Sequence, residues 1–406
     1  MKQITYLILS MIIFMGNTPL ASQEQPVFTG KIIDAETKEP VPLVAIRSST
    51  VYTITNTDGE YDIQTTKPDE QISFTHISYQ PQLIDYNQLP EVIELKPQIF
   101  ELAEIIITPR ETLIKELKEV WNKYMTLTKD KKDKDFPEST FYYRQLTSVD
   151  DSYTEYIECF FTAPTTVSIQ DMSLQEGRFA HINKKEIPNI TNYFYLSRIP
   201  PFSREKAQYK GSLNTFLCAD FEEHFEIYLN KIISPQQDNE IKVYEFVPKH
   251  PFIEKKAIFL SGKLFIRVKD NAIIRAEITP ASMGITFNKK IKVTDEENTF
   301  ILTYRDGVTS YPVIESVQAT TKITLSRNNE EKVMHIKSIL FTNDYTFDQK
   351  GKKVKQKDHL LKEVINSKYN QEFWDNNPVV KRTKIEQQVL DDFNKEGYFG
   401  TMNMVQ

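Results

Sequence analysis

The sequence predicts a mainly β protein, with a small N-terminal β-sandwich followed by a larger antiparallel sheet. Aromatic residues make up 12% of the chain, whereas it has only 11 glycines, and this mix suits many strands. Short β-forming runs alternate with turn residues along most of the sequence. Only two stretches, one linking the sheets and one near the C-terminus, have the periodicity of an amphipathic helix.

Length and composition are those of a two-domain globular protein. The chain has 406 residues, of which 40% are hydrophobic and 26% charged, and acidic and basic residues are interspersed with a net charge of -6. No basic stripe is present, so nucleic acid is not an expected partner. We expect a signal peptide at 1–22, a β-sandwich at 23–108, a helix and charged loop at 109–135, and a β-rich domain at 136–406.

The N-terminus is typical of a secretory signal peptide. Lys2 precedes an apolar run, Ile4 to Phe14, and small residues end the segment at Ser22. This run is too short to span a bilayer and no comparably long one follows, so we expect no transmembrane segment in the mature chain. No cysteine lies near the cleavage region, which argues against a lipoprotein.

The region 24–108 has the pattern of a small antiparallel sandwich, with turn signals at roughly ten-residue spacing. Asp58-Gly59 lies between two β-forming runs, Tyr52 to Thr55 and Tyr61 to Ile63, which predicts a tight hairpin. Ile72 to Tyr79 alternates as one strand. Pro40 and Pro42 indicate that the segment around them is an edge strand or a turn, because proline cannot donate a backbone hydrogen bond.

The order of the motifs in this region resembles the carboxypeptidase-like regulatory domain, a prealbumin-like or Ig-like β-sandwich. The resemblance rests on Gly30 to Asp34, Pro40 to Ile46, Thr55 to Ile63 and Leu102 to Ile107. Ser78 departs from the pattern, since a Gly usually precedes the aromatic residue. The resemblance implies a Gram-negative envelope protein, often a TonB-dependent receptor, but too little chain remains for a receptor barrel and no peptidase domain follows.

A helix is predicted directly after the sandwich. Thr108 as N-cap, Pro109 at the first helical position and Glu111 match a capping box. Leu113, Leu117, Val120, Trp121 and Tyr124 form one apolar stripe, which we expect to pack on the second domain. The mixed charges of Lys129 to Asp135 indicate a solvated loop.

Strands dominate the rest of the chain. Short connections such as Lys269-Asp270-Asn271 and Asp306-Gly307 predict an antiparallel meander, a pattern similar to the curved half-barrels of periplasmic lipoprotein carriers in fold alone. A capping box at Thr383 and Glu386 begins a terminal helix, which Gly397 ends with a Schellman contact between Phe393 and Tyr398. The predicted strands are Phe141 to Val149, Tyr153 to Phe161, Lys242 to Val247, Lys263 to Val268, Ala272 to Ile278, Thr299 to Tyr304, Val313 to Leu325 and Lys332 to Phe341.

The periodicity weakens between Gly177 and Pro235, which indicates a long aromatic loop over the sheet. Its rings could stack on a glycan or a lipid and its arginines could hold an anion, or the rings could simply cover the sheet. The candidate ligand-binding residues are Tyr193, Phe194, Tyr195, Arg198, Phe202, Arg204 and Tyr209.

Cys159 and Cys218 are the only cysteines, and two readings stay open. In an exported chain they could form a disulfide, or they could be two separately buried thiols. A redox-active pair is not expected, because no Cys-x-x-Cys motif is present.

The sequence offers little evidence for catalysis. The six histidines are widely spaced, none closer than His335 and His359, so we expect no metal site, and no cofactor motif is present. Glu155 and Glu158 would point to opposite faces of a strand.

We therefore expect a non-catalytic binding or scaffold module of the periplasm or outer membrane. Its partner would be an envelope protein, or a glycan or lipid. The alternatives are a hydrolase of envelope glycan or peptide and a periplasmic lipid or lipoprotein carrier.

Overall fold

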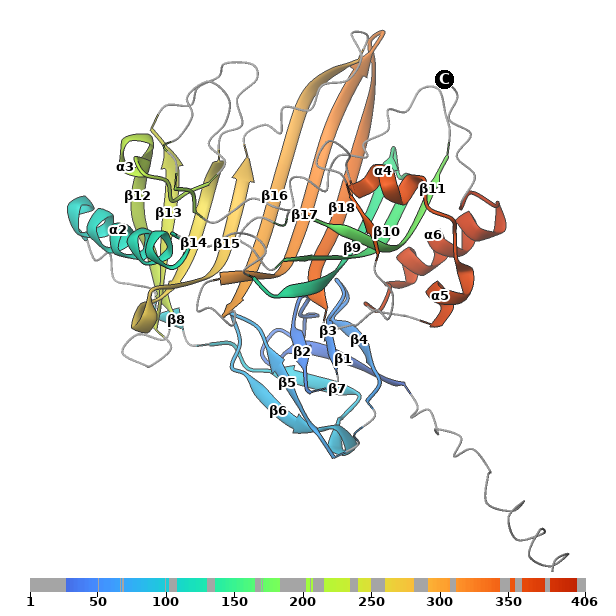
Figure 1. Ribbon diagram of the computed structural model, residues 1–406, viewed down its shortest axis with the longest axis horizontal. Coiled ribbons are helices and arrows are strands. Elements are labelled where there is room, and N and C mark those ends of the chain that lie inside the picture. Colours follow the sequence, from blue (N-terminus) through green and yellow to red (C-terminus); the bar gives the residue numbers. More distant parts are fainter. Residues whose placement is uncertain are drawn as a thin grey trace, which may run out of the picture.

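The computed structural model confirms a mainly β protein, with a small N-terminal domain and one large antiparallel sheet (Figure 1). It describes residues 27–399, except for 50, 66, 68, 99, 102–107, 130–135, 165–168, 170, 183–201, 205, 207–214, 234–239, 250–259, 281–290, 307–311, 344–350, 355–359 and 377–379. The signal-peptide prediction, the Leu102 to Ile107 motif, most of the charged loop and Gly307 lie outside these residues.

The N-terminal domain is a sandwich of two small sheets. One sheet has the order β4-β1-β7, with β7 parallel to β1, and the other has the order β3-β2-β5-β6. Ile32, Tyr61, Ile72 and Phe74 are fully buried between them. The elements are β1 (Phe28–Asp34), β2 (Ala45–Arg47), β3 (Tyr52–Ile54), β4 (Glu60–Ile63), β5 (Gln71–Thr75), β6 (Gln82–Asp85), the 3-10 turn η1 (Tyr86–Gln88) and β7 (Val92–Leu95).

The Asp58-Gly59 turn forms, but the predicted hairpin around it is wrong. Gly59 has φ +72°, and the Asn56 side chain accepts hydrogen bonds from the Asp58 and Glu60 backbone at 2.9 Å each. However, β3 pairs with β2 in one sheet and β4 pairs with β1 in the other. The turn is therefore a corner of the sandwich, because each flanking strand finds its partner elsewhere.

The large sheet has twelve strands in the order β19-β11-β10-β9-β18-β17-β16-β15-β14-β13-β12-β8. It contains two meanders, which join where β9 pairs with β18 over ten residue pairs, from Met334–Val149 to Asn343–Thr140. The strands are β8 (Phe100–Glu101), β9 (Glu138–Val149), β10 (Ser152–Pro164), β11 (Ser173–His181), β12 (Phe225–Ile233), β13 (Ile241–Pro248), β14 (Leu260–Arg267), β15 (Ala272–Pro280), β16 (Lys292–Asp306), β17 (Pro312–Arg327), β18 (Glu330–Asn343) and β19 (Lys352–Lys353).

All eight predicted strands of this sheet are confirmed, but its other four strands, β8, β11, β12 and β19, were missed. β11 and β12 fall at the two ends of the stretch that we assigned to a loop, and a short helix, α3 (Phe221–His224), precedes β12. The predicted turn at Lys269-Asp270-Asn271 is confirmed, as a 3-10 turn, η4 (Val268–Asp270), followed by Asn271 at φ 54°. β8 lies within the predicted sandwich range but pairs with β12 in the large sheet.

Helix α2 (Arg110–Leu127) packs on one face of the sheet, as its apolar stripe predicts. Leu113, Leu117, Val120 and Tyr124 join the main hydrophobic core, and Glu116 accepts hydrogen bonds from Lys242 Nζ and Tyr244 Oη at 2.6 and 2.7 Å. The helix begins one residue later than predicted. Pro109 takes the N-cap position, without a side-chain cap hydrogen bond.

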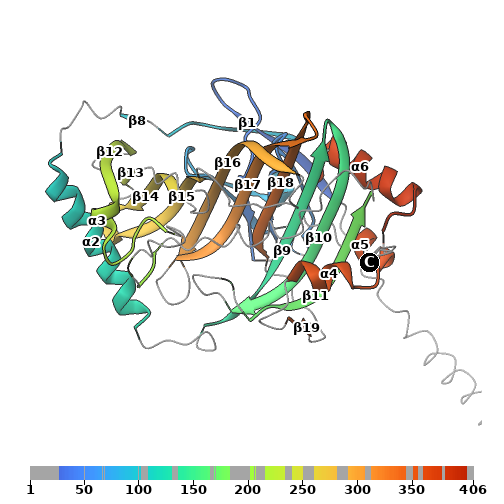
Figure 2. The ribbon, with the colours of Figure 1, turned by 90° about the horizontal axis from the view of Figure 1, so that it is seen from above.

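The opposite face of the sheet is covered by the N-terminal domain and by C-terminal elements (Figures 1 and 2). Tyr52 and Ile54 of β3 pack against Tyr142, Phe160 and Phe341 of the sheet. Ion pairs Arg47–Glu315 and Lys381–Asp62, the latter at 2.9 Å, tie the domain to the sheet and to the C-terminal segment. Of the C-terminal helices, α5 (Gln371–Asn376) and α6 (Lys384–Lys395) lie on this face, whereas α4 (Leu360–Ile365) packs on the α2 face, where Leu360 and Val364 join the main core.

Helix α6 has both of its predicted ends. The Thr383 side chain accepts from Glu386 N at 3.1 Å and Glu386 accepts from Thr383 N at 2.8 Å. At the other end, Gly397 has φ +69°, Tyr398 N donates to Phe393 O at 3.0 Å, and the Phe393 and Tyr398 rings are in edge contact. Within the described residues, no helix combines the length and apolar character needed to cross a bilayer.

Candidate functional site: a pocket beside a buried arginine–glutamate row

Three charged residues lie side by side on neighbouring strands of the sheet. The register pairs Glu158 of β10 with Arg144 of β9 on one side and with Arg178 of β11 on the other. All three side chains are at most 2% exposed. Alternation along the strands places this row on the face away from α2, whereas Ile157 and Cys159 join the α2 core.

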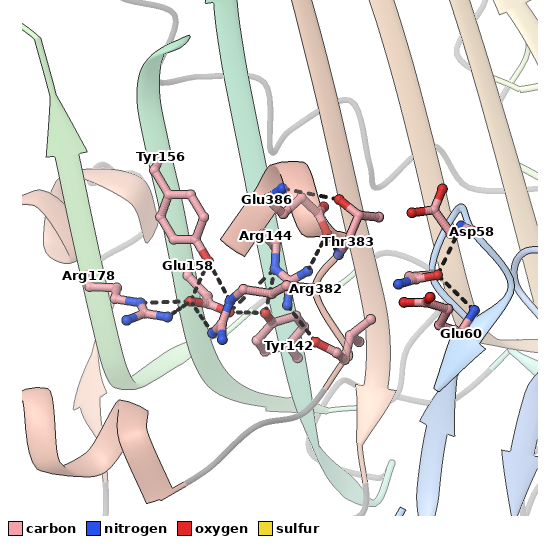
Figure 3. Close-up of polar contacts among 12 residues, drawn as sticks. Asp58, Glu60, Tyr142, Arg144, Tyr156, Glu158, Arg178, Arg382, Thr383 and Glu386 are labelled. Carbon is pink, nitrogen blue, oxygen red and sulfur yellow. Dashed lines mark hydrogen bonds and ion pairs between the residues drawn. The ribbon is translucent and has the colours of Figure 1, made fainter. Parts of the chain in front are cut away.

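Glu158 is surrounded by donors (Figure 3). Arg178 Nε donates to Glu158 Oε2 at 2.7 Å and Tyr156 Oη donates to the same oxygen at 2.8 Å. Tyr142 Oη donates to Oε1, and Arg382 Nη2 approaches both oxygens at 3.3 and 3.4 Å. This saturation is what a buried carboxylate needs, because an ionised group without partners is costly in a protein interior.

Electrostatics keep Glu158 ionised. Burial alone would raise the pKa of its carboxyl, but Arg178, Arg382 and Arg144 together hold that pKa well below its ordinary value. Burial, reinforced by Glu158, raises the pKa of the Tyr156 phenol, so it remains a donor.

The row also holds the C-terminal segment on the sheet. Arg382 comes from the segment that enters α6, and Arg144 Nη2 donates to Val380 O at 2.9 Å. Arg144 Nη1 reaches Glu386 Oε2 at 3.3 Å, and the Arg178 guanidinium lies 4.5 Å from the Trp374 ring centroid. Arg144 thus connects the row to the first turn of α6.

An open pocket of about 490 Å³ lies next to Arg144, where three parts of the molecule meet. We call it the junction pocket. Its floor is the sheet face of β9, β17 and β18, one wall is the N-terminal-domain turn, and another is the start of α6. Its residues are Pro42, Leu43, Thr55, Asn56, Thr57, Asp58, Arg144, Leu146, Ser148, Asp151, Tyr153, Gln318, Ala319, Thr320, His335, Lys337, Ser338, Ile339, Val380, Thr383, Ile385 and Glu386.

The floor carries one lysine and one histidine. Lys337 pairs with Leu146 on one side and Thr320 on the other, and His335 lies two residues away on the same face of β18. Among the described residues, neither Lys337 nor His335 has an ion-pair partner. Lys337 is solvent-exposed.

The walls carry acids and one buried donor. Asp58 and Asp151 are exposed carboxylates, and neither is ion-paired within the described part of the chain. Asn56 is 5% exposed, and its Nδ2 finds no acceptor among the described residues. Ile385, 59% exposed, and Tyr153 add apolar surface. The junction pocket can therefore bind a small polar molecule.

The sequence pointed to other residues for ligand binding. Tyr193, Phe194, Tyr195, Arg198 and Tyr209 lie outside the described residues. Phe202 is 6% exposed and stacks on Tyr124 of α2 at 4.8 Å between ring centroids. Arg204 Nη2 donates to Met125 O and Thr128 Oγ1, both at 3.1 Å. In the structure, therefore, Phe202 and Arg204 attach their segment to the end of α2.

Cys159 and Cys218 are two separately buried thiols, and the disulfide alternative is not formed. Cys159 points from β10 into the α2 core, whereas Cys218 precedes α3, where its Sγ lies 3.4 Å from Asp220 Oδ1. Burial, with Glu158 nearby, raises the pKa of the Cys159 thiol.

One cluster resembles a metal site in composition. Ligand atoms of Asp220, Glu223 and His224 lie within 4.8 Å of one another. Asp220 and His224 are buried and their side chains contact each other at 3.2 Å, whereas Glu223 is exposed. A histidine–carboxylate contact accounts for this arrangement, so we assign it no metal. The sequence search for paired histidines could not find it.

The comparisons with known proteins identify the first domain only. Residues 28–107 match the CarboxypepD_reg-like domain family, as the motifs indicated. No curated protein matches the chain.

Similar solved structures include a LolA superfamily protein from Nitrosomonas europaea, with TM-score 0.18 and 10% identity over 59% of this chain and 96% of that one. Lipovitellin has TM-score 0.23 and 6% identity, over 54% and 26%. A putative membrane-associated protein of unknown function from Bacteroides fragilis has TM-score 0.15 and 9% identity, over 79% and 98%. Scores this low support no conclusion about fold or function.

Proposed function

We propose that this protein is an exported, non-catalytic binding module of the bacterial envelope that holds a small polar ligand in the junction pocket. The observation that carries the proposal is the pocket itself, built by the N-terminal domain, the sheet and α6 together. Sites between structural units are common positions for small-molecule binding, and this volume falls in the range of such sites.

The leader supports export, and the regulatory-like domain supports an envelope location by analogy. The domain contributes the Thr55–Asp58 wall of the pocket, so in this chain it is part of the ligand site as well as an accessory module. A periplasmic or outer-membrane protein that recognises the ligand-bound form would be its partner.

The two carboxylates that contact Arg144, those of Glu386 and Glu158, favour binding over hydrolysis because both already have partners within the protein. Glu386 is held by Arg144 and by the Thr383 backbone, and Glu158 is saturated by three arginines and two tyrosines. A general acid or base must exchange protons with substrate, and both of these carboxylates are committed to structural contacts.

The proposal is tested by thermal unfolding of the mature chain, 23–406, with and without a small-molecule extract of Gram-negative envelopes. Binding to the native state alone raises the Tm. Thr320→Trp would fill the pocket from an exposed floor position, and Thr294→Trp places the same ring on β16, outside the pocket. The extract should raise the Tm of the wild type and of Thr294→Trp but not of Thr320→Trp. An equal rise in all three, or in none, would refute the proposal.

A further inference from the structure

The charges of the junction pocket fall into two groups, one already paired and one not. Arg144 and Glu386 contact each other at 3.3 Å, and both have further partners in the protein. Lys337, Asp58 and Asp151 have no ion-pair partner among the residues that the structure describes. Only this second group is available to a ligand.

The available charged side chains lie on different structural elements. Lys337 stands on the sheet floor, with His335 two residues away, about 7 Å along the strand. Asp58 belongs to the N-terminal-domain turn and Asp151 to the turn between β9 and β10. A ligand in the pocket therefore has a cation beneath it and carboxylates at its sides.

A buried polar group on the pocket wall is positioned by its own hydrogen bonds. Asn56 Oδ1 accepts from the backbone N–H groups of Asp58 and Glu60, which fixes the orientation of the amide. Its Nδ2 is then a buried donor with no acceptor among the described residues. Buried donors are nearly always satisfied, so a water or a ligand group that reaches this wall can supply the acceptor for Asn56 Nδ2.

We infer that the junction pocket takes a small zwitterion, a molecule with a primary ammonium group and a carboxylate, such as a short peptide with free ends. The carboxylate pairs with Lys337, and the ammonium group pairs with Asp58 and Asp151. A carbonyl oxygen of the ligand accepts from Asn56 Nδ2. This inference rests on the proposed function, since it names the ligand class of the same pocket.

The test uses the mature chain and four forms of trialanine in calorimetric titrations: free at both ends, N-acetylated, C-amidated, and blocked at both ends. We expect the free form to bind tightest, and each block to weaken binding about tenfold, the effect of one charge-assisted contact. In Lys337→Gln the C-amide should no longer matter, and in Asp58→Asn the effect of the N-acetyl group should shrink. Lys292→Gln and Asp69→Asn, exposed changes outside the pocket, should leave all four affinities unchanged.

Equal binding of the free and doubly blocked peptides would overturn the zwitterion assignment. So would an undiminished effect of both blocks in Lys337→Gln and Asp58→Asn, or no binding of any form. The proposed function is judged separately, because the extract-induced rise in Tm and its loss in Thr320→Trp do not depend on the peptide.

Discussion

Arg178 and Glu158 face each other on β11 and β10, and Arg178 Nε lies 2.7 Å from Glu158 Oε2. Both side chains are at most 2% exposed, so this is an ion pair removed from water. Such a pair contributes little net stability relative to an apolar pair, but removal of one partner leaves a buried charge uncompensated. Arg382 and Arg144 share the same carboxylate, so Glu158 is one of the contacts that hold the C-terminal segment on the sheet.

Glu158→Gln should lower the free energy of unfolding by about 3–5 kcal/mol, because three arginines lose their shared counter-charge. The measurement is urea unfolding followed by circular dichroism. Glu297→Gln is the control, since Glu297 is 63% exposed and pairs only at the surface with Lys322, which predicts a loss of about 1 kcal/mol or less. Similar losses in the two variants would contradict a structural role for the row.

Tyr52→Ala should weaken the attachment of the N-terminal domain. Tyr52 is 9% exposed, and its ring lies 5.8 Å from that of Phe341 in the large sheet. Loss of this contact should cost roughly 3 kcal/mol and lower the Tm. Leu83→Ala, at a position 59% exposed on β6, should change the Tm little. Comparable Tm losses would mean that the domain does not depend on this contact.

His76 should make stability depend on pH. Burial, with Arg275 nearby, lowers the pKa of His76 to about 3, while the unfolded chain has a histidine pKa of about 6.5. Below pH 6.5 the unfolded state therefore binds a proton that the folded state does not. Stability relative to His76→Gln should fall as the pH is lowered from about 6.5 to about 3, and level off below that range. The measurement is the denaturant midpoint of the wild type and of His76→Gln at several pH values across this range. A difference in midpoint that does not change with pH would contradict the prediction.

Gly397→Ala should cost about 1 kcal/mol, because φ is +69° and a side chain disfavours this left-handed conformation. Its Cβ would meet no atom of the described residues within 4 Å, so the expected cost is one of backbone conformation. Gly397→Asn should lose less, since Asn tolerates this region better. Thermal unfolding distinguishes the two, and an Ala variant as stable as the wild type would exclude the Schellman end.

Cys159 and Cys218 should react with iodoacetamide only after unfolding, because both thiols are buried and unlinked. Mass spectrometry of protein alkylated before and after denaturation, without reductant, measures this. We expect two added groups in the denatured protein and none in the native one. A denatured protein that takes up label only after reduction would show that a disulfide had formed.

The row and the pocket were only partly predictable. Two-residue alternation already places Tyr142 with Arg144, and Tyr156 with Glu158, on one side of their strands, since the strands themselves were predicted. Arg178 was missed because its strand falls where the periodicity weakens. Arg382 precedes a helix correctly predicted from its caps, but nothing local to it identifies Glu158 as its partner.

The sequence by itself determined the elements that depend on near neighbours. These are eight of the twelve strands of the large sheet, the stripe of α2 and both ends of α6, which follow from short-range periodicity and turn or cap chemistry. The N-terminal domain was identified by the resemblance of its motifs to a known family. Only the tertiary structure decided that β9 pairs with β18, that β3 and β4 join different sheets, and that Asp58, Lys337 and Glu386 surround one pocket. Those outcomes depend on which segments far apart in the chain pair with each other, and in which register. The pairing that buries the apolar faces of the sheets is the one that forms.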